Sequence, residues 1–204
     1  MKTFRALLVF VVLLVLVGLG ILYSGVYDVS ATKPDSKAVA WILETASEHS
    51  IERHSRGIAA PKLDDPALLR TGIVHYQEMC VTCHGGPGDI PASEIGQGLN
   101  PTPPMLGEAA GDPPAELFWV VKNGIKMTGM PAFGPTHTDE QIWAIVAFVK
   151  KLPQYTTEKY QAELAAAEGA GHEEHEHGEA GEPAAPQSAE PGHTHPPGTP
   201  PHKD

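Results

Sequence analysis

The apolar residues of the chain begin with one long uninterrupted run. Residues 6–23, ALLVFVVLLVLVGLGILY, carry no charge and follow Lys2 and Arg5. About 18 apolar residues nearly cross the ~30 Å hydrocarbon core of a bilayer, whereas the apolar part of a signal peptide usually has ~7–15 residues. The run therefore predicts a single membrane-spanning helix that stays attached to the protein.

A cleaved signal peptide is the alternative interpretation of this run. Residues 29–31, VSA, offer a small-residue cleavage site. We favour the anchor because of the length of the run. Since Lys2 and Arg5 precede the run and Asp28 follows it, the positive-inside rule predicts that the rest of the chain lies outside the cytoplasm, which in a bacterium is the periplasm.

Four later stretches have the composition or periodicity of helices: 37–57, 66–79, 115–124 and 138–152. Two of them begin with recognisable caps. Asp64 and Asp65 precede a first-turn Pro66, and Thr138 with Gln141 forms a capping box. Because no stretch of the core alternates convincingly like a strand, the pattern predicts an all-α fold.

Two stretches between these helices lack any periodicity. Residues 85–114 are mostly Gly, Pro and small polar residues, and residues 125–137 form a second loop. Irregular stretches this long in a small domain are usually functional. After residue 154 a helical stretch, TTEKYQAELAAAE, passes into a segment without core-forming residues, which predicts disorder.

These patterns divide the chain into four parts. We expect an N-terminal membrane anchor at 1–31, a periplasmic helical stalk or linker at 32–63, a core domain at 64–153, and a mostly disordered tail rich in Glu, Ala, Pro and His at 154–204. The helix at 37–57 is expected to be either a stalk or a strap that lies on the domain.

The charge of the chain argues against nucleic acid as a partner. The sequence has 25 acidic and 14 basic residues, a formal net charge of −11, whereas binding to nucleic acid needs a basic surface. The core also has few cations, namely Arg70, Lys122, Lys126, Lys150 and Lys151. We therefore expect no docking face ringed by lysines, and we find no residue set for turnover of a small-molecule substrate.

The only two cysteines, Cys80 and Cys83, lie in the stretch CVTCHGG. A thioredoxin-like redox pair needs a preceding strand, but a helix is predicted there. A zinc site would have two thiolates and one imidazole, which is one ligand short of a closed structural site. Attachment of haem uses all three groups, because both thiols bond its vinyl groups and His84 can ligate the iron. The motif therefore favours one covalent haem c.

In this context the motif resembles the class I cytochromes c, and in particular the membrane-anchored monohaem members of the bacterial periplasm. The resemblance covers 64–153. In that family a helix with a Gly-x-x-x-aromatic pattern leads into the motif and crosses the last helix. Gly72 and Tyr76 match the first helix, and Ile145 with Phe148 matches the last. The resemblance implies three to five short helices around one covalent haem.

The resemblance also implies a methionine as the second iron ligand, on a loop before the last helix. Met130 in the segment GMPAF matches that position, and Met127 is the rival three residues earlier. Met79 is expected to serve in helix packing. Lys126 and His137 flank this loop, which departs from the family pattern, and either could ligate iron in a perturbed state.

On the other side of the haem, the resemblance implies a proline carbonyl that accepts the ring N–H of His84. Pro104, in the segment Pro104-Met105-Leu106, is the best match, although Pro101 and Pro103 lie close to it. Such a hydrogen bond orients the imidazole and raises its basicity.

The remaining histidines fall into two groups. His49, His54 and His75 lie on predicted helices without an evident ligand partner and are expected to be solvated. The tail histidines, among them His172, His175 and His177, alternate with Glu or Pro. They form either a weak Cu, Ni or Zn site or an unselected polar tail.

Together these features predict a periplasmic, membrane-anchored cytochrome c that carries single electrons between respiratory redox partners and is not itself an enzyme. The alternatives are a fixed cytochrome subunit of a membrane dehydrogenase or oxidase complex, and a periplasmic metal-capture protein that acts through its histidine-rich tail.

Overall fold

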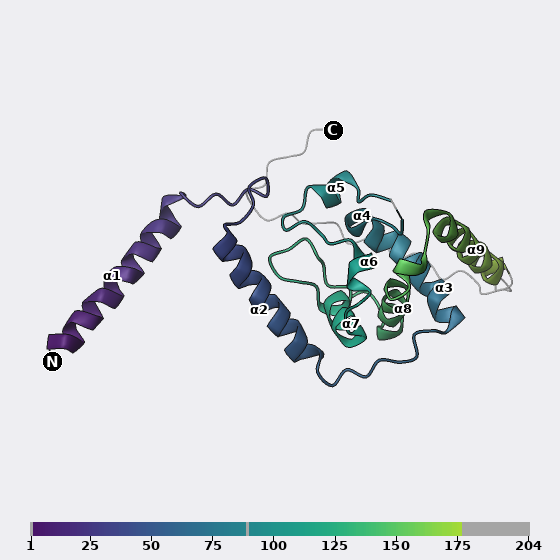
Figure 1. Ribbon diagram of the computed structural model, residues 1–204, viewed down its shortest axis with the longest axis horizontal. Coiled ribbons are helices and arrows are strands. Elements are labelled where there is room, and N and C mark those ends of the chain that lie inside the picture. Colours follow the sequence, from purple (N-terminus) through teal and green to yellow (C-terminus); the bar gives the residue numbers. More distant parts are fainter. Residues whose placement is uncertain (1, 89, 177–204) are drawn as a thin grey trace, which may run out of the picture.

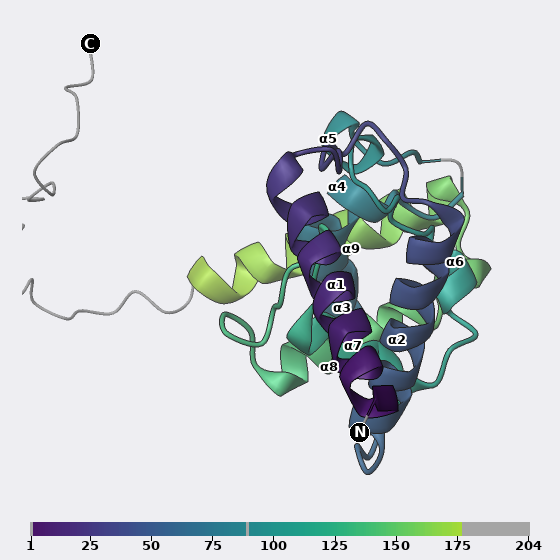
Figure 2. The same ribbon diagram turned by 90° about the vertical axis from the view of Figure 1, so that its left-hand side faces the viewer.

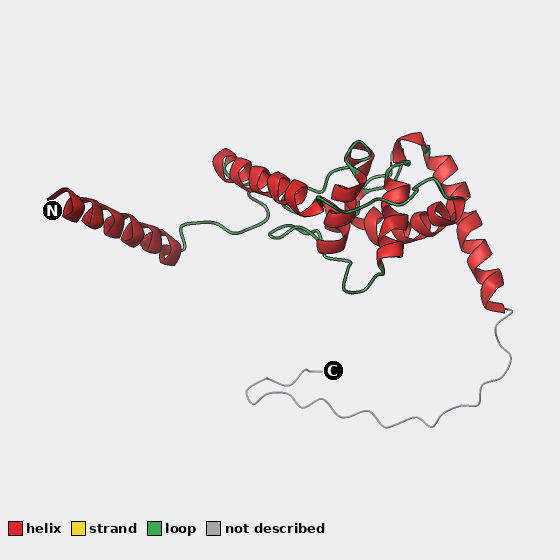
Figure 3. Cartoon of the chain, turned by 90° about the horizontal axis from the view of Figure 1, so that it is seen from below, coloured by secondary structure: helices red, strands yellow, loops and turns green. Residues whose placement is uncertain are grey.

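The structure, a computed structural model, describes residues 2–88 and 90–176, which form helices and loops without any strand (Figure 3). The helical elements are α1 (Lys2–Ser24), α2 (Lys37–Ser55), α3 (Pro66–His75), the π-helical turn η1 (Tyr76–Cys80), α4 (Val81–His84), α5 (Glu94–Gln97), α6 (Leu106–Ala109), α7 (Pro114–Asn123), α8 (Asp139–Val149), the 3-10 turn η2 (Leu152–Gln154) and α9 (Thr157–Glu176). The predicted all-α fold is confirmed.

Helix α1 extends away from the remaining helices (Figure 1). Its mean hydropathy reaches 3.0, and none of that stretch is buried against the rest of the protein. A helix of 23 residues is about 35 Å long. Helix α1 is therefore long and apolar enough to cross a membrane, as a membrane anchor or a signal sequence would be.

The core forms where α3 crosses α8. A Cβ atom on Gly72 would lie 2.1 Å from the carbonyl oxygen of Ala144, so only glycine allows the two backbones to approach this closely. Beside this contact the rings of Tyr76 and Phe148 meet edge to face with centroids 5.2 Å apart. The crossing expected from the glycine and aromatic pattern is thus confirmed.

The N-termini of α3 and α8 are fixed by the predicted caps. The Asp65 carboxylate accepts a hydrogen bond from the backbone N–H of Ala67 at 2.8 Å, and Pro66 occupies the first turn. At the start of α8, Thr138 and Gln141 form the reciprocal capping box. Each cap satisfies backbone donors that have no partner within the helix.

Helix α9 extends the core beyond the boundary at residue 153 that the sequence indicated. Tyr160 is only 2% exposed, and its hydroxyl donates to Oε1 of Gln77 at 2.6 Å. Thr157 donates to the carbonyl of Pro87, which ties the start of α9 to the loop after the cysteine motif. The first half of α9 is therefore packed on the domain. Helix α9 also continues to Glu176, into the segment from residue 169 for which the sequence predicted disorder, and residues 177–204 lie outside those described.

Helix α2 lies against the domain on the side that faces α1, as Figures 1 and 2 show. Its C-terminal half packs on α7, where the rings of His54 and Trp119 stack with centroids 5.6 Å apart and Ser55 is buried. Gly57, with a φ of +88°, turns the chain away after the helix. Helix α2 thus forms a strap on the domain.

Replacing Gly72 with alanine should destabilise the fold, because the new methyl group overlaps a backbone carbonyl that cannot move without shifting α8. Overpacking of this kind costs roughly 1–3 kcal/mol or more. Denaturant unfolding of Gly72→Ala should therefore show a lower midpoint than the wild type. Gly107→Ala is the matched control, because nothing lies within 4 Å of a Cβ atom there. Equal midpoints for both variants would contradict the crossing.

Replacing Tyr160 with alanine should also lower the free energy of unfolding, by roughly the 3–5 kcal/mol typical of a buried aromatic residue. The neighbouring Gln161 is exposed on the same helix, so Gln161→Ala should change the midpoint little. If Tyr160→Ala unfolded at the wild-type denaturant concentration, α9 would not be part of the core.

Candidate functional site

The two cysteines lie on a continuous helical path rather than after the end of a helix. From α3 the chain passes through η1 and α4, so Cys80 ends the π-helical turn and Cys83 lies in the following turn. A π-helical turn is rare and often occurs at functional sites. The sequence predicts a helix here but not its π-helical turn, since the composition of η1 does not differ from that of an ordinary helix.

The loop after the motif is held in place by a buried hydrogen bond. The Tyr76 hydroxyl donates to the carbonyl of Gly85 at 2.8 Å. Gly85 has a φ of +71°, and a Cβ atom there would lie 2.6 Å from the carbonyl oxygen of Ile90. The same tyrosine that packs at the helix crossing therefore also fixes the end of the CVTCH segment.

Cys80, Cys83 and His84 line one cavity of about 620 Å³. Cavities of roughly 300–1,000 Å³ are the usual size for small molecules and cofactors. Most of its lining is apolar and comes from α7, α8 and the two long loops, including Leu99, Leu117, Val121, Ile125, Ile145, Val146 and Val149. The cavity thus lies between the crossing of α3 with α8 and the two irregular stretches at 85–114 and 125–137.

The His84 ring is oriented by the carbonyl of Pro104. Its Nδ1 atom lies 2.8 Å from that oxygen, and because a carbonyl oxygen can only accept, the ring nitrogen is the donor. This bond involves Pro104 rather than Pro101 or Pro103, although all three prolines line the cavity. It leaves Nε2 of His84 as the nitrogen that can ligate a metal.

On the loop before α8, the structure brings Met130 and not Met127 to the cavity. Met130 is half-buried in the cavity lining, whereas Met127 is 82% exposed and has a φ of +60°. The backbone of Met130 is held at both ends: its N–H donates to Oγ1 of Thr128, and its carbonyl accepts from the N–H of Ile125. The thioether is therefore presented by a constrained segment.

The other candidate ligands that flank this loop do not reach the cavity. Lys126 is exposed, and His137 is bonded to Oγ1 of Thr136 at 2.8 Å while its ring packs on Phe133. Neither Lys126 nor His137 lines the cavity. Met79 lines the cavity and also packs against the core cluster.

Two walls of the cavity were not anticipated from the sequence. Ile51 and Glu48 of α2 line it, although the core domain was expected to begin only at residue 64. Glu116 and Asp112 also line it, so every charged residue in its wall is acidic. The inward spacing of Ile51, His54 and Ser55 on α2 is the one sequence signal that could have indicated this packing.

The chemistry of the wall fits haem c better than a thiol redox pair. Burial raises the pKa of the Cys80 thiol to about 12, with the neighbouring Cys83 adding to the shift. Reactive redox thiols instead have lowered pKa values. Two thiols, an oriented imidazole and a soft thioether around an apolar cavity are the groups that bind a covalently attached haem.

A metal site in the tail stays a prediction. Among the described residues no group of three or more His, Cys, Asp or Glu side chains is placed to hold a metal ion. His172 and His175 lie on the last turns of α9, where only the backbone is described, and His177 lies outside the described residues.

Comparison with known proteins gives a match to the part of the chain that forms most of this cavity. Residues 67–149, about two fifths of the sequence, match the family model described as cytochrome C oxidase, cbb3-type, subunit III. No curated protein matches the chain. The matched segment begins in the first turn of α3 and ends with α8, so it includes the helix crossing, the motif and both loops. This segment of the chain is a class I c-type cytochrome domain.

Proposed function

We propose that the protein is a monohaem cytochrome c, anchored by α1 in the bacterial inner membrane, that carries single electrons between respiratory partners in the periplasm. The observation that supports this proposal best is that Cys80, Cys83, His84 and Met130 all line one apolar cavity. The length and hydropathy of α1 support the anchor.

Each of these residues has a distinct role in this proposal. Cys80 and Cys83 would hold the cofactor covalently through two thioethers, and His84 and Met130 would ligate its iron. Haem c, when bound, supplies a one-electron Fe(III)/Fe(II) couple. Pro104 keeps the His84 ring in one orientation, so little rearrangement is needed when the charge at the site changes.

The surroundings of the cavity act on the redox potential in two directions. A thioether ligand and apolar walls favour the reduced state, which has the lower positive charge. The carboxylates of Glu48, Asp112 and Glu116 favour the oxidised state, because a negative charge stabilises the additional positive charge. We therefore expect a potential below that of a cytochrome with the same ligands and a neutral wall.

Partners are proposed to dock on exposed apolar residues around the cavity. Ile95 is 69% exposed on α5, whose Gly96 packs against the backbone of Cys83. Met105 and Met127 are 42% and 82% exposed, and each adjoins a residue of the cavity lining. A small apolar surface of this kind suits the weak, transient contacts of electron carriers.

A second candidate function is a fixed cytochrome subunit of a membrane oxidase or dehydrogenase complex. The family model that matches residues 67–149 is described as a subunit of a cytochrome oxidase, which favours this alternative. Metal capture by the histidine-rich tail is a further proposal, and it would act independently of the cavity.

Replacing Met130 with alanine should remove the thioether that would ligate the haem iron. The oxidised wild-type protein is expected to show the weak near-red absorption band of thioether-bound ferric haem and to fit a one-electron potentiometric titration. In Met130→Ala the band should vanish and the potential should fall, as water, Lys126 or His137 takes the position. Met127→Ala is the control and should keep the band and most of the potential. Loss of the band in Met127→Ala alone would sink the assignment of Met130.

Gentle extraction of membranes distinguishes between the two proposed functions, a free carrier and a fixed subunit. A free carrier should elute alone after mild detergent treatment and size-exclusion chromatography, because its docking contacts are small and release quickly. Stoichiometric co-elution with a dehydrogenase or oxidase, persisting at raised salt concentration, would instead establish the fixed subunit.

A further inference from the structure

One side of the N-terminal half of α2 presents two large exposed apolar side chains, flanked by an exposed alanine and a partly buried threonine. Ala38, Trp41, Ile42 and Thr45 follow the spacing i, i+3, i+4, i+7 and therefore lie on one side of the helix. We call these four residues the Trp41 face. Trp41 is 66% exposed and Ile42 is 56% exposed. This side of α2 contributes nothing to the packing on α7, which uses His54 and Ser55.

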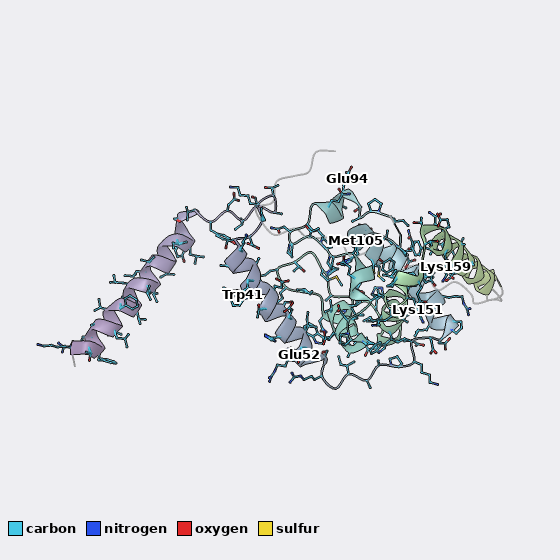
Figure 4. The ribbon with its side chains drawn as sticks, viewed as in Figure 1. Trp41, Glu52, Glu94, Met105, Lys151 and Lys159 are labelled. Atoms are coloured by element: carbon cyan, nitrogen blue, oxygen red, sulfur yellow. The ribbon has the colours of Figure 1, made fainter. Side chains whose placement is uncertain are left out.

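The same side of α2 becomes polar towards its C-terminal end. There it presents His49, Glu52 and Arg53, all exposed, and Glu52 pairs with Arg56 at 2.9 Å. Figure 4 shows Trp41 in the N-terminal half of α2 and Glu52 near the other end. The apolar part is thus confined to the end of α2 that follows α1 in the chain.

The connection to α1 is short and partly held against the domain. Only residues 25–36 separate α1 from α2. Within them Lys33 pairs with Asp28, and the carbonyl of Lys33 accepts a hydrogen bond from Nδ2 of Asn100 at 3.2 Å. The eight residues 25–32 can span at most roughly 28 Å. The point at which Lys33 is held on the domain, four residues before α2, therefore lies within this distance of the end of α1.

From this arrangement we propose that the Trp41 face rests in the boundary between headgroups and acyl chains of the bilayer that α1 spans. The inference rests on the proposed anchoring by α1. Tryptophan is enriched at this depth of a membrane, and a short apolar face on a surface helix is suited to it. Since tethering by α1 creates a high effective concentration, even a weak contact is sufficient.

This contact would orient the cytochrome domain. Helix α2 carries Ile51 and Glu48 in the cavity wall, so fixing α2 on the bilayer also fixes the direction of the cavity relative to the membrane. The redox partners must then reach the cavity close to the membrane surface.

A fluorophore that reports its surroundings can test the contact. The full-length, haem-loaded protein is placed at low density in vesicles of phosphatidylethanolamine and phosphatidylglycerol, with the probe on Ala38→Cys. Quenching by spin-labelled lipid is compared with quenching by iodide in water. Lipid quenching at this position should exceed, several-fold, that of the same probe on Arg53→Cys, which is exposed near the C-terminal end of α2. Adding Trp41→Ser and Ile42→Ser should reduce the Ala38 signal to the Arg53 level.

A third probe, on Leu14→Cys in α1, separates this inference from the anchoring that it needs. Lipid quenching at Leu14 with iodide quenching at Ala38 overturns the bilayer contact and leaves the anchor standing. Iodide quenching at both positions contradicts the anchor and the contact together. Protection of Ala38 from both quenchers would show that a protein surface, such as a second copy of this chain, covers the Trp41 face instead, and it would also overturn the proposal.

Discussion

The close approach of α3 and α8 at Gly72 is the constraint on which the site depends. Without a side chain at this position, the two backbones meet, and Tyr76 and Phe148 pack beside the contact. Tyr76 then reaches Gly85 with its hydroxyl group, so the crossing and the end of the cysteine motif are fixed together. The position of Cys80 and Cys83 in the cavity wall follows from this geometry.

The loops complete the site by backbone contacts rather than by regular structure. The carbonyl of Pro104 orients His84, and Gly124 lies so close to the Met130 loop that a Cβ atom would be 2.7 Å from the carbonyl of Met130. Because each loop is held by backbone contacts, one irregular segment orients the imidazole of His84 on α4 and the other holds Met130 at the cavity, without a scaffold of strands. The carboxylates of Glu48, Asp112 and Glu116 would lower the redox potential of a bound haem, whereas the apolar lining would raise it.

Much of this arrangement could be predicted because its determinants are local. Caps such as Asp65 and the Thr138–Gln141 pair specify where helices start. Gly72 specifies a helix that packs closely against another helix, and the cysteine motif follows that helix in the chain. The packing of Tyr160 could not be predicted in this way. It depends on contacts across more than 80 residues with a partner, Gln77, that has no distinctive pattern.

The role of α2 in the cavity wall was missed for a related reason. Its sequence is only weakly amphipathic, because an apolar exposed face at one end offsets the inward residues such as Ile51. The sequence therefore left a stalk and a strap on the domain open for α2, and the structure shows the strap, which also forms a wall of the cavity. The short helices α5 and α6 were likewise read as loop, since four residues are too few to establish a period.

Intact-mass spectrometry of the purified, fully denatured protein tests the central claim most directly. If Cys80 and Cys83 bind haem through thioethers, the denatured chain should have the mass of the polypeptide plus one haem and should keep its colour in acidified acetone. A mass equal to that of the polypeptide alone, with the pigment extracted into the solvent, would contradict the account.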